Sequence, residues 1–244
     1  MTTDNTSLHI FDNVESLVST MAEFFIEQSD EAIAQRGRFT VALSGGNSPR
    51  NLYALLASVK YRDRVAWEKI LFFFSDERFV PADDPQSNYR MAKETLFDPL
   101  GIPQHHVFAV NTSISPSASA GAYEEAIRKQ FDARCSFDLI LLGLGDNAHT
   151  ASLFPRADIL DEKRSLVKAF FVNELNQFRI TFTAPLINDA RVIAFLTYGV
   201  SKADAVYHTL REPFNPEEYP AQLVRPQQGK VHWFLDKDAA KRVG

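Results

Sequence analysis

The chain has 244 residues, 45% of them hydrophobic, including twenty phenylalanines, and a formal net charge of −5. This length and composition fit one domain with a sizeable core and argue against a disordered chain. The acidic balance, without any run of lysine or arginine, argues against a nucleic-acid partner or an anionic membrane surface. No apolar run reaches the roughly 18 residues of a membrane span and the first residues lack an export signal, so we expect a cytoplasmic protein.

Six apolar segments rich in β-branched and aromatic residues predict strands, because near-continuous hydrophobicity is typical of strands buried on both faces. They lie at residues 39–43, 70–74, 137–142, 165–172, 178–183 and 191–197. Shorter segments at 8–11 and 230–235 are expected at the edges of the sheet. Apolar residues at helical spacing predict helices at 14–35, 49–58, 88–97, 117–134 and 201–210. The alternation predicts an α/β fold, a mostly parallel, doubly wound sheet with helices on both faces, as a single domain over residues 1–244.

Polar segments follow three of the most apolar predicted strands. SGGNSP follows 39–43, SDERFVP follows 70–74, and GLGDNAHTASLFP follows 137–142. Ligands of open parallel sheets bind beyond the carboxyl ends of the strands. We therefore expect these three loops to converge on one crevice.

The first of these loops combines glycines with the start of a predicted helix. Ser44, Gly45 and Gly46 precede a helix whose free N–H groups and positive end would suit a phosphate, while an ordinary strand-to-helix turn is an equal alternative. Four of the ten glycines, Gly45, Gly46, Gly143 and Gly145, lie in two loops, which suggests a close approach to a ligand. The segment is neither a P-loop nor a GxGxxG loop, so no nucleotide cofactor is indicated.

Among six histidines, His149 alone follows a predicted buried strand through a glycine-bearing turn. That position can hold a catalytic group against a substrate on a rigid scaffold.

No trio of histidine, cysteine or carboxylate has metal-ligand spacing, so we expect no metal. A serine nucleophile is not supported, since GxSxG is absent. The single Cys135 lies just before an apolar run and is expected to be a buried structural thiol.

Five ordered blocks make the chain resemble the 6-phosphogluconolactonase family, which is related in fold to the glucosamine-6-phosphate deaminases and isomerases. The blocks are ALSGGNSP, FFFSDERFVP, LILLGLGDNAHTASLFP, RITFTAPLIN and PAQLVRPQQGKVHWFLDKDAA, and they span about residues 40–240. The resemblance implies hydrolysis of 6-phospho-D-glucono-1,5-lactone to 6-phosphogluconate in the oxidative pentose phosphate pathway. It implies no cofactor and no obligate protein partner, only a small phosphosugar lactone as substrate.

In this interpretation neutral His149 takes a proton from the attacking water and later returns one to the departing ring oxygen. N–H groups around Gly143–Gly145, or a cationic side chain, would stabilise the oxyanion. For the phosphate, the resemblance and the need for local positive charge select Arg179 and Lys202, with Arg78 as a further candidate.

The chain departs from the family pattern beside the histidine. The family commonly has Asp-Gly there, whereas this chain has Asn147 and Ala148. Asparagine can orient an imidazole through a hydrogen bond but adds no charge. Alanine in place of glycine predicts a negative φ at residue 148, because the left-handed region would cost roughly 1–2 kcal/mol.

Two further alternatives stay open at this point. The departure raises the possibility of a non-catalytic domain that binds or senses phosphosugars, although such a domain would not need His149. A glucosamine-6-phosphate deaminase or isomerase is disfavoured because the histidine block continues as Ser152-Leu153-Phe154-Pro155. The related enzymes usually have an asparagine-glutamate pair after that block.

Overall fold

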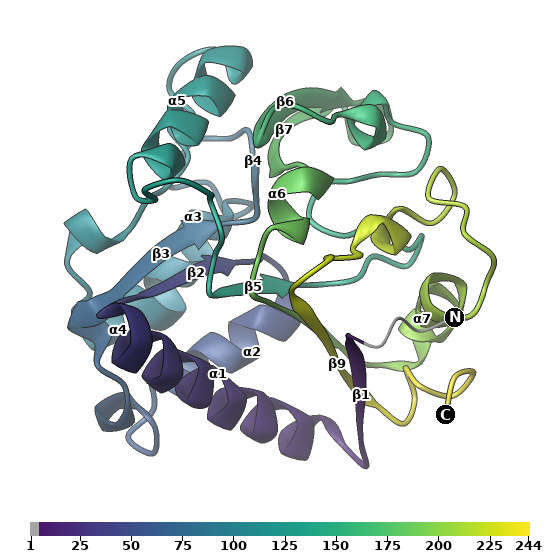
Figure 1. Cartoon of the computed structure of the whole chain (residues 1–244), viewed down its shortest axis with the longest axis horizontal. Helices are drawn as coiled ribbons and strands as arrows, with labels where there is room; N and C mark the ends of the chain where they lie inside the picture. Colours follow the sequence, from purple (N-terminus) through teal and green to yellow (C-terminus); the bar gives the residue numbers. More distant parts are fainter. Residues whose placement is uncertain (1–4) are drawn as a thin grey trace.

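The structure is a computed structural model that describes residues 5–244. Within that range, six parallel strands form the main sheet in the order β1-β9-β8-β5-β2-β3 (Figure 1). The strands are β1 (Thr6–Phe11), β2 (Phe39–Leu43), β3 (Ile70–Phe74), β5 (Leu139–Leu142), β8 (Val192–Thr197) and β9 (Lys230–Asp236). The helices are α1 (Val14–Arg36), α2 (Asn47–Leu56), α3 (Asn88–Ala92), α4 (Asp98–Leu100), α5 (Pro116–Arg128), α6 (Ala184–Asn188) and α7 (Ala203–Leu210). The predicted α/β class and the parallel sheet are confirmed.

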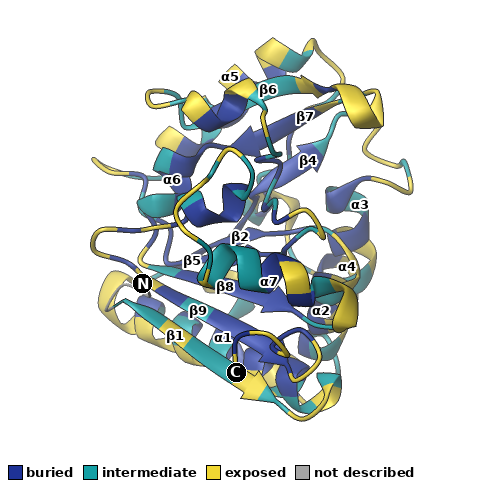
Figure 2. Cartoon of the chain, turned by 90° about the vertical axis from the view of Figure 1, so that its right-hand side faces the viewer, coloured by how far each residue is buried: buried dark blue, intermediate teal, exposed yellow. Residues whose placement is uncertain are grey.

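Alternate residues of the central strands face two separate hydrophobic cores, as the two-residue period of a strand requires. Val41 and Phe72 pack in the core shared with α1 and α2, whereas Ala42 and Phe73 pack in the core shared with α5 and α6. Figure 1 shows α1 and α2 on one side of the sheet and α5 and α6 on the other. Figure 2 shows the inner strands of the sheet as mostly buried, whereas the edge strand β1 is mostly intermediate.

The two segments predicted at 165–172 and 178–183 are strands, but they do not join the parallel sheet. They form β6 (Val167–Val172) and β7 (Gln177–Phe182), which with β4 (Asp76–Arg78) make a small antiparallel sheet in the order β4-β7-β6. Only a short turn separates β6 from β7, with Asn176 in the left-handed conformation at φ 47°. A connection this short permits only antiparallel pairing, because parallel neighbours need a long crossover.

Two predicted helices differ from the structure in length or in helix type, whereas the other three agree to within two residues at each end. The segment 117–134 is helical only as Pro116–Arg128, and the segment 88–97 is an α-helix over Asn88–Ala92 followed by a π-helical turn. Cys135 is buried, in agreement with a structural thiol. No helix within residues 5–244 is long and apolar enough to cross a membrane.

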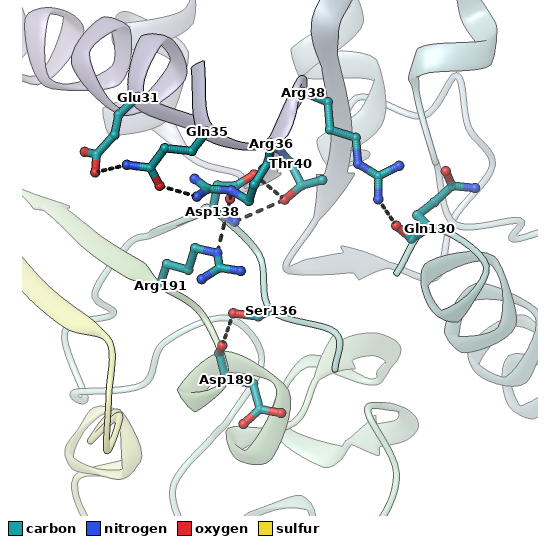
Figure 3. Close-up of polar contacts among 10 residues, drawn as sticks. All are labelled: Glu31, Gln35, Arg36, Arg38, Thr40, Gln130, Ser136, Asp138, Asp189 and Arg191. Carbon is teal, nitrogen blue, oxygen red and sulfur yellow. Dashed lines mark hydrogen bonds and ion pairs between the residues drawn. The ribbon is translucent and has the colours of Figure 1, made fainter. Parts of the chain in front are cut away.

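A buried carboxylate ties the amino-terminal ends of the strands together (Figure 3). Asp138 accepts hydrogen bonds from the backbone N–H and the hydroxyl of Thr40, each at 2.8 Å, and from Arg36 Nε at 2.8 Å. Arg191 Nε lies 3.4 Å from the same carboxylate. This network lies at the amino-terminal end of β5, opposite the end at which the polar loops follow the strands.

Candidate active site

A cavity of about 290 Å³ lies beyond the carboxyl ends of the strands. All three polar loops contribute to its wall, as expected from the sequence. Seven of the eight predicted site residues line it, namely Ser44, Gly45, Gly46, Arg78, His149, Arg179 and Lys202. The eighth, Asn147, lines a larger neighbouring cleft of about 990 Å³, and Phe154 lines both.

The turn that carries His149 is closed by two backbone hydrogen bonds. Gly145 N–H donates to the carbonyl of His149 at 2.8 Å, and Ala148 N–H donates to the carbonyl of Gly145 at 3.0 Å. Ala148 has a φ of 58°, so the negative φ expected from its side chain is wrong. Its methyl group is buried in the core at 1% exposure, and this burial offsets part of the conformational cost.

Asn147 holds the imidazole of His149. The Oδ1 of Asn147 lies 2.5 Å from Nδ1 of His149 and also accepts the backbone N–H of His149 at 3.3 Å. The second contact fixes which end of the amide faces the histidine, so Nδ1 must carry the proton. Nε2 is then the basic nitrogen of the ring.

The imidazole is packed on two sides. Phe154 stacks on it with ring centroids 4.3 Å apart, and a Cβ added to Gly145 would lie 2.1 Å from its ring atoms. Burial lowers the pKa of His149 to about 4, opposed by the negative charge of Asp76 and reinforced by the positive charges of Lys202 and Arg179. The ring is therefore neutral at physiological pH, as a general base must be.

The two arginines of the cavity lie directly opposite each other. Arg78 on β4 pairs with Arg179 on β7 in the antiparallel register. Arg179 is only 8% exposed, and burial lowers its pKa. Its side-chain partner is the neutral Oε1 of Gln177, and Arg78 donates to the carbonyl of Gln86 at 2.6 Å. Within residues 5–244 neither guanidinium is paired with a carboxylate, although like charges opposed across strands are unfavourable.

Lys202, at the end of a 3-10 turn before α7, differs from the arginines because it has an acidic partner. Its Nζ lies 2.6 Å from Oδ1 of Asp146, whose side chain is 69% exposed. An exposed pair of this kind is weak. A phosphate dianion in the cavity can therefore compete with Asp146 for the lysine.

The Ser44–Gly46 loop lines the cavity, and its two glycines can present only backbone there. The side chain of Ser44 is bonded elsewhere. Ser44 Oγ is buried and donates to the carbonyl of Leu141 at 2.7 Å. Gly46 has a φ of 101° and nothing within 4 Å of the Cβ position. A Cβ on Gly45 would instead lie 1.8 Å from Oδ1 of Asn88, so this glycine makes room for a protein side chain.

Asn88, the first residue of α3, does not cap the helix. Ser87 is the capping residue, and Asn88 Nδ2 donates to the carbonyl of Asp76 at 2.8 Å. Asn88 thereby joins the glycine loop to β4.

Asp76, Ser152 and Phe154 also line the cavity wall, and sequence reasoning gave no role to Phe154. Ser152 Oγ donates to Oδ2 of Asp76 at 2.7 Å. Phe154 could have been found from its place in the HTASLFP block, five residues after the histidine. No group of three histidine, cysteine or acidic side chains within residues 5–244 is arranged to hold a metal ion.

Comparison with known proteins identifies the family of the chain. Residues 12–233 match the family described as glucosamine-6-phosphate isomerases/6-phosphogluconolactonase. A 6-phosphogluconolactonase of Synechocystis sp. is 42% identical, over 87% of this chain and 88% of the relative. One from Nostoc sp. is 35% identical, over 97% of this chain and 98% of the relative. The solved 6-phosphogluconolactonase of Trypanosoma brucei superposes with a TM-score of 0.86 at 28% identity, over 98% of this chain and 99% of that one. The chain therefore belongs to the 6-phosphogluconolactonase family within the glucosamine-6-phosphate isomerase superfamily.

Proposed function

We propose that the chain hydrolyses 6-phospho-D-glucono-1,5-lactone to 6-phospho-D-gluconate, with His149 as general base. One observation carries the proposal: a neutral, oriented imidazole shares a cavity with a buried guanidinium that has no acidic partner among residues 5–244. The guanidinium suits an anionic end of a substrate, and the imidazole suits activation of water at the other end. We infer the substrate from the relatives, which are named 6-phosphogluconolactonase.

Nε2 of His149 would take a proton from water while the water oxygen bonds to the lactone carbonyl carbon. The carbonyl π electrons move to oxygen and give a tetrahedral oxyanion. When the carbonyl re-forms, the bond to the ring oxygen breaks, and the imidazolium returns its proton to that oxygen. The product is a carboxylic acid and a free hydroxyl, and the histidine is again neutral.

The oxyanion needs a positive or N–H partner. The N–H of Gly145 donates to the carbonyl of His149 and is not free for this purpose. Gly143, Leu144 and the cationic side chains line the same cavity, so their N–H groups and charges are the candidates for this role.

The phosphate group would bind between Arg179, Arg78, Lys202 and the backbone of Gly45 and Gly46. The arginines can each offer a forked pair of donors, and lysine adds a point charge. Ser44 would not donate to the phosphate, because its hydroxyl donates to the carbonyl of Leu141 and its backbone N–H donates to the hydroxyl of Tyr53 at 3.0 Å. A cytoplasmic location remains a prediction from the sequence.

A coupled assay with freshly made lactone tests the function, since the product 6-phosphogluconate can be followed by its oxidation. We expect turnover by the wild-type protein well above spontaneous hydrolysis, and a loss of roughly a hundredfold or more in His149→Gln. Equal rates for the two proteins would contradict the role of His149 as general base. Release of ammonia from glucosamine 6-phosphate would instead indicate the deaminase, and binding of 6-phosphogluconate without any turnover would indicate a sensing domain.

A further inference from the structure

Asp76 supplies the only carboxylate among the described residues that line the site cavity. It begins β4, and its side chain is nearly buried, with 9% of the residue exposed. Ser152 donates to Oδ2 at 2.7 Å, whereas Oδ1 has only a 3.3 Å contact from Asn88 Nδ2. These neutral donors fix the carboxylate at the cavity wall and leave its negative charge in place.

The adjacent carboxylate, Glu77, is also buried but has a different role. Its two oxygens accept the backbone N–H groups of Arg78, Asn88 and Tyr89 and the hydroxyl of Ser87. All of its capacity is thus used to hold the start of α3. Glu77 is structural, and Asp76 is the acidic group presented to the reaction.

Four charged groups affect the pKa of His149, whose ring is held by the neutral Asn147. Lys202 and Arg179 lower the affinity of the imidazole for a proton, while Asp76 and Asp146 raise it. Asp146 is largely exposed and already paired with Lys202, so its influence is screened and compensated. Asp76 is buried and has no ion pair within residues 5–244. It is therefore the group that balances positive charge on the ring.

We propose that Asp76 is the counter-charge of the imidazolium that forms on His149 during lactone hydrolysis. This inference rests on the proposed function. When Nε2 accepts the proton of water, the ring gains one positive charge in a cavity that already contains three cations. Asn147 orients the ring through Nδ1 but cannot neutralise that charge. Asp76 supplies the negative charge, and the pair returns to its starting state when the proton passes to the ring oxygen.

The free protein gives a test that needs no substrate. Imidazole signals of wild type and Asp76→Asn would be followed by NMR during acid titration, with the His149 signal identified by its loss in His149→Gln. In wild type the pKa of His149 is about 4. In Asp76→Asn we expect the ring to stay neutral to a lower pH. An unchanged midpoint would overturn the proposal.

Kinetics test the same charge during turnover. In Asp76→Asn we expect kcat to fall by roughly tenfold or more, with the acidic limb of kcat/KM moved to lower pH. Adding Asn147→Asp to this variant places a carboxylate against Nδ1, so most of the lost kcat should return. If Asp76→Asn lowers kcat by the same factor with and without Asn147→Asp, the two positions share no electrostatic role and the proposal is contradicted.

Glu77→Gln is the matched control, because it neutralises the neighbouring buried carboxylate. It should lower Tm without moving the acidic limb. If it moves the limb as Asp76→Asn does, the effect is structural and the proposal fails. Asp76→Ser is a second neutral variant if Asp76→Asn does not fold. Absence of lactonase activity in the wild-type protein would contradict the proposed function. The NMR titration would still show whether the charge of Asp76 acts on His149.

Discussion

Arg78 and Arg179 are directly opposed across the β4–β7 pair, and both line the site cavity. Two like charges at paired positions of a sheet are unfavourable unless an anion lies between them. The pairing of β4 with β7 therefore concentrates positive charge beside the cavity of an acidic protein.

Arg179→Lys should raise KM for the lactone by roughly tenfold or more while kcat changes little, because a charge-assisted forked contact is lost and the charge is kept. Steady-state kinetics would separate the two parameters. Arg64→Gln is the control, since Arg64 forms an exposed ion pair with Glu23 at 2.6 Å away from the cavity. A larger effect on kcat than on KM would place Arg179 at the reacting carbon.

Asn147→Ala should lower kcat by roughly ten- to a hundredfold, because the imidazole loses the contact that fixes its tautomer and direction. Asn147→Asp retains the contact and adds a negative charge, so the pKa of His149 should rise and the acidic limb should move to higher pH. The pH profile of kcat/KM distinguishes the two. Activity of Asn147→Ala equal to wild type would mean that Phe154 alone orients the ring.

The lowered pKa of His149 also predicts acid sensitivity of the fold. The folded value of about 4 lies below the ordinary value of 6.5. At neutral pH the ring is neutral in both states and has no effect. As pH falls below 6.5, His149 binds a proton in the unfolded chain but stays neutral in the folded chain. The free energy of unfolding therefore decreases until pH falls through about 4, where the folded chain is protonated too.

His149→Gln removes this contribution. Chemical denaturation at about pH 7 and about pH 5 should therefore show a smaller loss in the variant than in wild type. The pKa of His232 is also lowered to about 4, so some acid sensitivity remains in both proteins. An identical loss in the two proteins would show that the ring titrates normally in the folded state.

Gly145→Ala should abolish activity, because the new Cβ would lie 2.1 Å from the His149 ring and must displace it. Gly121→Ala is the matched control: this residue lies within α5, and nothing lies within 4 Å of its Cβ position. There the change should increase the free energy of unfolding by about 0.5–1 kcal/mol and leave activity intact. Activity and denaturation curves of both variants check the contrast.

Asp138→Asn should lower the free energy of unfolding by about 2 kcal/mol, since charge-assisted hydrogen bonds to Thr40 and Arg36 are weakened in a buried position. The network lies at the amino-terminal end of the strands, so kcat and KM should be unchanged. Thermal unfolding and kinetics on the same samples separate stability from function. A change in KM would mean that the two ends of the sheet are coupled.

The sequence by itself determined the class of the fold and which loops form the site. The apolar runs of the central strands specify burial on both faces, and the carboxyl ends of parallel strands must lie at one edge, so the three polar loops were predicted together. Local chemistry also predicted His149 and Asn147 as candidate catalytic residues.

Only the tertiary structure decided which neighbours these residues meet. The opposition of Arg78 and Arg179 depends on antiparallel pairing between segments about a hundred residues apart, which a local apolar pattern does not encode. The positive φ of Ala148 was missed because a buried methyl and two turn hydrogen bonds override the backbone preference of alanine. The separate roles of Asp76 and Glu77 were likewise invisible, because they follow from which donors each buried carboxylate meets. Burial of charge is a property of the assembled protein, and the chemistry of this site depends on it.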